Sequence, residues 1–213
     1  MEREMRHLKA LIERYPQLDA AQNDILSCYE HLAACFEGGG KLLIAGNGGS
    51  AADAEHIVGE LMKGFLLPRK TDSEFTRKLM QAEPRLGARL ADQLQGALPA
   101  MALSGHGALA TAFQNDCDPQ LCFAQQVNGY GRPGDVFLGL STSGNSENVL
   151  YAAVTAKAKG MTVLGLTGAA DSALSALADV CIQVPAVMTY QIQELHLPVY
   201  HTLCMMLEEH FFG

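Results

Sequence analysis

Short apolar runs alternate with longer amphipathic stretches over most of the chain. The runs read KLLIA at 41–45, PAMALSG at 99–105, DVFLGL at 135–140, MTVLGLTG at 161–168 and DVCIQVP at 179–185. Nearly continuous apolar character, without alternation, is typical of parallel strands that are covered on both faces. We therefore predict an α/β fold, a three-layer α/β/α sandwich around a five-stranded parallel sheet, with a flavodoxin-like strand order.

The stretches between and beside these runs predict helices. Residues 1–14 read as an amphipathic helix, and residues 18–37 as a second helix that ends at three glycines, 38–40. The sequence ENVLYAAVTAKAKG at 147–160 predicts a helix ended by Gly160, and 189–212 is helical in composition. We interpret residues 1–213 as a single domain with N-terminal helices over 1–37.

The stretch 66–97 interrupts this alternation between the first helix of the sheet and the second strand. It is charged and largely helical after Thr71. We interpret it as an insertion, either a solvated pair of surface helices or an element that packs beside a site or a partner subunit. Its basic side chains could also lend a cation to a phosphate; they are Arg69, Lys70, Arg77, Lys78, Arg85 and Arg89.

Composition and charge narrow the classes of function. The chain of 213 residues is 48% hydrophobic and 18% charged, with a formal charge of −8, so a basic surface for nucleic acid is not expected. Six cysteines occur without any CxxC pair, which favours reduced, apolar packing residues inside the cell. No apolar signal core or membrane-spanning run is visible. We expect a cytoplasmic protein without nucleic-acid or membrane partners.

Two loops of small polar residues follow strands and open helices: GNGGS at 46–50 and STSGNS at 141–146. Their glycines let a ligand approach the backbone, and a helix N-terminus favours an anion. Either loop alone could simply cap its helix. Because ligands bind beyond the carboxyl ends of parallel strands, the two together predict a phosphate site. Neither matches a Walker or GxGxxG motif, which favours a small phosphorylated molecule over a nucleotide.

Two helices carry candidate acid–base or metal-ligating side chains. His56 and Glu60 are four residues apart, so they share a helix face after the first loop. Such a pair can hold a divalent metal, can do acid–base chemistry, or can be an ordinary solvated contact. Gln193 and His201 lie on the last helix, where Pro198 should bend the helix and could turn His201 towards the side of Gln193. A histidine there can also be a buried core residue.

In this order and spacing, the motifs resemble the phosphoheptose isomerase family of the sugar isomerase (SIS) superfamily. The resemblance runs from about residue 20 to the end, apart from 66–97. It implies a homotetramer with active sites between subunits, Glu60 as catalytic base and His201 as catalytic acid. It also implies a zinc site, seen in some members, with His56, Glu60, Gln193 and His201 as ligands. The residues that it places at the substrate are Asn47, Gly48, Gly49, Ser50, Ser141, Thr142, Ser143, Ser146 and Gln193.

The chemistry of an aldose–ketose isomerase suits these residue types. A proton moves between C1 and C2 of the sugar through an enediol; a carboxylate can take it, and a histidine can shuttle protons between the oxygens. Zinc would polarise the carbonyl. One residue cannot be a zinc ligand and a free base without some rearrangement. The leading reaction is sedoheptulose 7-phosphate to D-glycero-D-manno-heptose 7-phosphate.

Three positions depart from the family pattern. Gly105 and Tyr190 stand where the family usually has Asp, and Gly64, after Lys63, stands where it has Arg. These positions contact substrate or phosphate in the family, so a pentose or hexose phosphate is an alternative substrate. Another alternative is a non-catalytic phosphosugar-binding or assembly protein, as in the relative that serves a bacterial replication initiator, although that relative lacks the acid–base pair. A third is another SIS enzyme, such as a lyase or amino-sugar isomerase.

Overall fold

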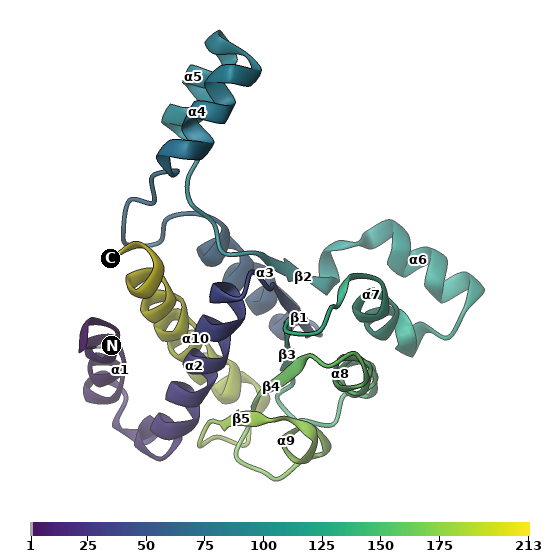
Figure 1. Cartoon of the computed structure of the whole chain (residues 1–213). Helices are drawn as coiled ribbons and strands as arrows, with labels where there is room; N and C mark the ends of the chain where they lie inside the picture. Colours follow the sequence, from purple (N-terminus) through teal and green to yellow (C-terminus); the bar gives the residue numbers. More distant parts are fainter. Residues whose placement is uncertain (1) are drawn as a thin grey trace.

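A parallel sheet with helices on both faces forms the body of the computed structural model, which describes residues 2–213 (Figure 1). The strands run in the order β2-β1-β3-β4-β5, and every neighbouring pair is parallel. This arrangement confirms the predicted three-layer α/β class and the flavodoxin-like order. The strands are β1 (Leu42–Gly46), β2 (Ala100–Ala102), β3 (Val136–Leu140), β4 (Thr162–Thr167) and β5 (Val180–Gln183).

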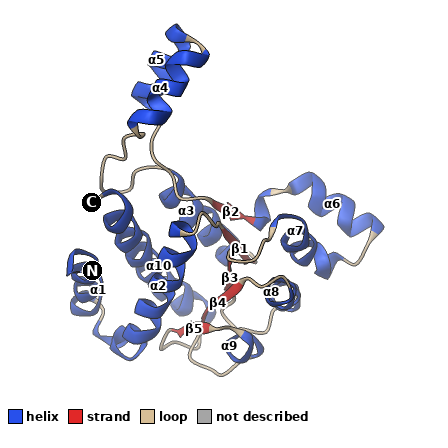
Figure 2. Cartoon of the chain, viewed as in Figure 1, coloured by secondary structure: helices blue, strands red, loops and turns tan. Residues whose placement is uncertain are grey.

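Helices cover the sheet and extend beyond it, as the blue ribbons of Figure 2 show. No helix within residues 2–213 is long and apolar enough to cross a membrane. The α-helices are α1 (Glu2–Arg14), α2 (Gln22–Glu37), α3 (Gly49–Met62), α4 (Ser73–Ala82), α5 (Pro84–Gln93), α6 (Gly107–Asp116), α7 (Cys122–Tyr130), α8 (Glu147–Ala158), α9 (Ala173–Leu177) and α10 (Thr189–Phe212), and the 3-10 turns are η1 (Pro16–Ala21), η2 (Leu103–Gly105) and η3 (Pro119–Leu121).

Alternate residues of each central strand enter two separate cores. Leu42 and Ile44 of β1 pack with α1, α2, α3 and α10 on one face. Leu43 and Ala45 pack with α7, α8 and α9 on the other face. Every residue of β1 and β3 is buried, as continuous apolar runs predict for strands covered on both sides.

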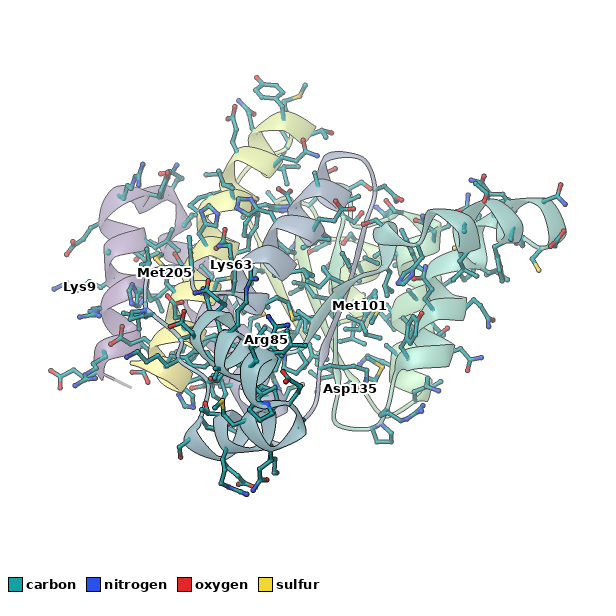
Figure 3. All side chains as sticks on the ribbon, turned by 90° about the horizontal axis from the view of Figure 1, so that it is seen from above. Lys9, Lys63, Arg85, Met101, Asp135 and Met205 are labelled. Atoms are coloured by element: carbon teal, nitrogen blue, oxygen red, sulfur yellow. The ribbon has the colours of Figure 1, made fainter. Side chains whose placement is uncertain are left out.

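The N-terminal helices lie against α10, on the face that also holds α3. In Figure 3, seen from above, Met205 lies on the side of α10 that faces α1, whereas Lys9 points away from the body. The second helix was predicted over 18–37, but it begins only at Gln22, because residues 16–21 form the tight turn η1, which buries Leu18 as the chain reverses. This packing makes α1 and α10 neighbours.

The insertion at 66–97 forms a helical hairpin that projects from the body (Figure 1). Its two helices, α4 and α5, pack on each other, and Phe75, Leu86 and Leu90 remain exposed. The hairpin confirms helical structure after Thr71. At its root, the Arg69 side chain is 0% exposed and its Nε donates to Glu208 Oε1 at 2.8 Å. Arg69 is therefore held by Glu208, and the expectation that it could lend a cation to a phosphate is wrong.

Candidate active site

The two polar loops meet at the carboxyl ends of β1 and β3. These strands are neighbours, and the chain leaves β1 for β2 on one side of it and later returns to β3 on the other. The side-chain amides of Asn47, in the first loop, and Asn148, in the first turn of α8 just after the second loop, exchange two hydrogen bonds of 2.9 Å. The predicted phosphate loops therefore lie side by side at the switch point of strand order, where ligands bind in open α/β sheets.

Hydroxyl groups of the second loop, 141–146, turn towards each other and not towards the helix. Ser141 Oγ and Ser146 Oγ are 3.0 Å apart, and Ser143 Oγ accepts from the Asn145 N–H at 3.2 Å. Ser146 is the N-cap of α8, yet its side chain makes no capping hydrogen bond. Gly144 holds a φ of +64° and packs directly against Ser172. The hydroxyls are thus not used as caps, which disfavours the simple capping interpretation and favours a phosphate cradle.

Three titratable side chains from α3 and α10 gather at one point. His56 Nε2 lies 3.3 Å from Glu60 Oε1 and 3.3 Å from His201 Nε2. Glu60 is more enclosed than His56, because its side chain is 12% exposed against 43% for His56. Lys63 Nζ, one turn beyond, lies 3.3 Å from Glu60 Oε2. Glu60, the expected base, and His201, the expected acid, are therefore brought together with His56, which shares a helix face with Glu60. The Lys63 ammonium group lies beside the Glu60 carboxylate.

The electrostatics of His196 and His201, both on α10, differ. Burial lowers the pKa of His201, His56 lowers it further, and Glu60 partly opposes both. Burial lowers the pKa of His196 to about 4, and its Nε2 lies 3.3 Å from the carbonyl oxygen of Thr167. His196 is fully buried, so it is the neutral core histidine that the sequence allowed. His201 lies instead at a hollow of about 420 Å³ between α1 and α10.

Gln193 occupies a different part of the site from His201. Its amide rests against Gly49, where an added Cβ would meet Gln193 Nε2 at 2.5 Å. Gln193 therefore lies at the first loop, whereas His201 contacts His56. Within residues 2–213, no group of three or more His, Cys, Asp and Glu side chains is arranged so that it could hold a metal ion. The four expected zinc ligands are thus divided between two places in this conformation.

The sequence of this chain is similar to those of known proteins over most of its length. The family model of the SIS domain matches residues 78–168. Phosphoheptose isomerase from Rhodospirillum rubrum is 40% identical over 178 residues, which cover 84% of this chain and 81% of that protein. The chain belongs to the phosphoheptose isomerase family. A second family member, phosphoheptose isomerase 2 from Campylobacter jejuni, is 38% identical over 84% of this chain and 76% of its own.

Solved structures of the family share the fold of this chain. Phosphoheptose isomerase from Neisseria gonorrhoeae superposes with a TM-score of 0.73 at 31% identity, covering 98% of both chains. The enzyme from Francisella tularensis gives a TM-score of 0.75 at 29% identity, covering 98% of this chain and 97% of the other. The likeness thus extends over nearly the whole chain.

The three departures from the family pattern have different surroundings. A Cβ on Gly64 would meet the carbonyl oxygen of Leu67 at 2.8 Å, so the turn into the hairpin excludes a side chain there. Gly105 has open space around it, and Tyr190 is 58% exposed at the start of α10. Lys63, directly before Gly64, pairs with the Glu60 carboxylate at 3.3 Å.

Sequence reasoning missed two polar residues that contact the acid–base cluster. The Tyr200 hydroxyl donates to Asp53 Oδ1 at 3.2 Å and lies 3.0 Å from His56 Nδ1. Asp53 precedes His56 by one helical turn, and Tyr200 adjoins His201, so both stand at helix positions that can reach the cluster. That spacing is a signal for Asp53, but nothing in the sequence links Tyr200 to α3.

Proposed function

We propose that the chain interconverts sedoheptulose 7-phosphate and D-glycero-D-manno-heptose 7-phosphate. The observation that carries the proposal is the convergence of Glu60, His56 and His201 in a member of the phosphoheptose isomerase family. A carboxylate beside an imidazole supplies the base and the proton shuttle that an enediol route needs. A protein that only binds phosphosugars has no use for such a cluster, so its presence favours catalysis over the assembly role.

The proposed reaction runs in two proton transfers on carbon. The Glu60 carboxylate takes a proton from C1 of the ketose, and the electrons of that bond form the C1–C2 double bond of the enediol. Glu60 then returns the proton to C2, which leaves the aldose. His201 donates to one sugar oxygen and accepts from the other, so that the oxygens exchange the proton needed for the carbonyl to change place.

Phosphate binding is assigned to the second loop in this proposal. Ser141, Thr142, Ser143 and Ser146 surround the N-terminus of α8, whose first N–H groups point out of the helix. Asn47, Gly48, Gly49 and Ser50 of the first loop, with Gln193 beside them, would contact the sugar hydroxyls. This assignment agrees with a phosphorylated sugar as the ligand of the family.

The distance along α3 supports sites that are shared between copies of the chain. Ser50 and Glu60 both lie on α3, about 15 Å apart along its axis at 1.5 Å per residue. Seven carbons and a phosphate ester joined by bonds of about 1.5 Å span only ~10 Å. We therefore propose a homotetramer in which the loops of one copy and the acid–base cluster of another can face one sugar.

A zinc ion is a separate proposal. Two imidazole nitrogens and a carboxylate are donors that zinc prefers, but His56, Glu60 and His201 do not form a three-ligand group as placed in the described chain, so they would have to move to bind the ion. Gln193 would have to leave Gly49 to become the fourth ligand. When bound, zinc would polarise the sugar carbonyl, and no step above depends on it.

Replacing Glu60 by Gln tests the catalytic assignment. We expect turnover to fall by roughly 10²–10⁴-fold, because the amide cannot accept the proton from carbon, while binding of the phosphosugar persists. Glu55→Gln is the matched control: it lies on the same helix, is exposed, and accepts a hydrogen bond from Ser104 Oγ at 3.2 Å. Turnover by the Glu60→Gln variant at the rate of the native chain would remove Glu60 from the mechanism.

A further inference from the structure

A chain of hydrogen-bonded side chains from α3 and α10 leads to the acid–base cluster. It begins at Asp53, passes through the Tyr200 hydroxyl to His56 Nδ1, and ends where His56 Nε2 meets His201 Nε2. Tyr200 is 1% exposed, and its ring meets the rings of His56 and His201 edge-on, with centroids 5.5 and 4.9 Å away. The hydroxyl therefore has a fixed position between the carboxylate and the imidazole.

The direction of each hydrogen bond follows from counting protons. A tyrosine hydroxyl has one proton to give, and a carboxylate can only accept. A tyrosine hydroxyl ordinarily has a pKa of about 10, so the hydroxyl keeps its proton at neutral pH. Bonds to a charged acceptor are the stronger ones, so Tyr200 gives that proton to Asp53. The hydroxyl oxygen then has only lone pairs to offer His56 Nδ1, and Nδ1 must carry a hydrogen.

The same count of protons determines the state of Nε2, the other nitrogen of the His56 ring. A neutral imidazole with its hydrogen on Nδ1 has a bare lone pair on Nε2. That lone pair faces His201 Nε2 and Glu60 Oε1, each 3.3 Å away. His201 can satisfy it by donating from its own Nε2. His56 Nε2 is thus a hydrogen-bond acceptor that lies between Glu60 and His201, the two groups that would exchange protons with the sugar.

We propose that Tyr200, anchored on Asp53, is a positioning residue that holds His56 in the Nδ1–H tautomer and keeps its Nε2 free towards Glu60 and His201. This role deepens the proposed function and rests on it for its catalytic consequence. The tautomer itself does not depend on which sugar is bound. Asp53 supports the assignment, because its second oxygen, Oδ2, is buried without a hydrogen-bond partner, so the Tyr200 hydroxyl is its hydrogen-bond donor at the cluster.

The test uses Tyr200→Phe, which removes one oxygen and keeps the ring that packs against the histidines. Long-range ¹H–¹⁵N NMR of the histidine-labelled full chain, treated with chelator and held at a pH where imidazole is neutral, reports which ring nitrogen carries the hydrogen. His56→Gln identifies the His56 signals. We expect the native chain to hold the hydrogen on Nδ1, and Tyr200→Phe to shift His56 towards the Nε2–H form. We expect kcat to fall roughly tenfold with KM nearly unchanged.

Tyr29→Phe provides the matched control, because the Tyr29 hydroxyl also lies 3.0 Å from a histidine Nδ1, that of His210, away from the cluster. It should change neither the His56 signals nor kcat. A native His56 with its hydrogen on Nε2, or an unchanged tautomer and kcat in Tyr200→Phe, would overturn the proposal. If the native chain turns over no sugar phosphate, the proposed function fails, and the NMR comparison still decides the role of Tyr200.

Discussion

Glu208→Gln should destabilise the chain far more than loss of a surface charge. The Glu208 carboxylate on α10 accepts from the N–H groups of Phe65, Leu66 and Leu67 at 2.7, 2.7 and 3.1 Å, and from Arg69 Nε at 2.8 Å. The amide NH₂ group of the glutamine would face N–H donors, with which it cannot form hydrogen bonds. The buried Arg69 guanidinium would also lose its anionic partner. The substitution therefore breaks the joint between the root of the hairpin and α10.

The expected magnitude follows from the burial of the pair. Both side chains are nearly inaccessible, at 0% for Arg69 and 1% for Glu208. Removing one partner of such a pair costs about 3–5 kcal/mol. At about 2–4 °C per kcal/mol for a chain of this size, the melting temperature should fall by roughly 6–20 °C. Arg69 also donates to the carbonyl oxygens of Glu60 and Leu61 at 2.8 and 2.7 Å, so the end of α3 should loosen as well.

At acidic pH, the difference in the free energy of unfolding between the native chain and Glu208→Gln should become smaller. Burial raises the pKa of Glu208, but the N–H groups of Phe65 and Leu66 and the Arg69 guanidinium outweigh it, and the net pKa is lowered. A lowered carboxyl pKa contributes stability above the unfolded value near 4.3, and this stability is lost as the pH falls through the folded pKa. The native chain should therefore lose its advantage over Glu208→Gln below about pH 4.

Urea unfolding at several pH values measures both effects. Glu74→Gln is the control, since Glu74 pairs with Lys78 on α4 at 2.7 Å with both side chains more than half exposed, and it should change stability by less than about 0.5 kcal/mol. A loss of stability in Glu208→Gln as small as that of the control, or one that grows in acid, would show that the Arg69–Glu208 pair does not stabilise the fold as described.

Two further predictions concern the second loop. Gly144→Ala should destabilise the chain by about 1–2 kcal/mol or more and weaken phosphosugar binding, because Gly144 has φ +64° and a Cβ would overlap Ser172; Gly107→Ala, with nothing within 4 Å, should be neutral in the same melting and binding assays. Ser141→Ala should weaken phosphosugar binding by about 0.5–1.5 kcal/mol by calorimetry, since one hydroxyl of the cradle is lost, and unchanged affinity would place the phosphate elsewhere.

The sheet was predictable because its signals are local. The central strands β1 and β3 bury every residue, so the apolar runs at 41–45 and 135–140 mark them directly. The two loops follow these strands without a gap, and parallel topology brings them together. No element was predicted over residues 106–130, where the structure has α6 and α7. Helix α6 buries no residue and α7 buries only Gln126 and Val127, so the sequence there has little apolar periodicity that would indicate a helix.

Contacts between distant segments could not be predicted in the same way. Arg69 lies in a charged stretch typical of solvated helices, and only the folded chain places Glu208, far along the sequence, against it. Tyr200 likewise reaches Asp53 and His56 only because α10 packs on α3. The spacing of His56 and Glu60 sufficed for their contact because one helix carries both.

Proton exchange between the sugar and solvent shows whether the chain catalyses the isomerisation. The purified chain is incubated with sedoheptulose 7-phosphate in heavy water, once with chelator and once with added zinc, and NMR follows the C1 protons and the signals of any aldose. We expect deuterium at C1 and the appearance of the heptose aldose, both lost in Glu60→Gln and kept in Glu55→Gln. Bound sugar phosphate with no exchange under either condition would contradict catalysis and favour a binding role.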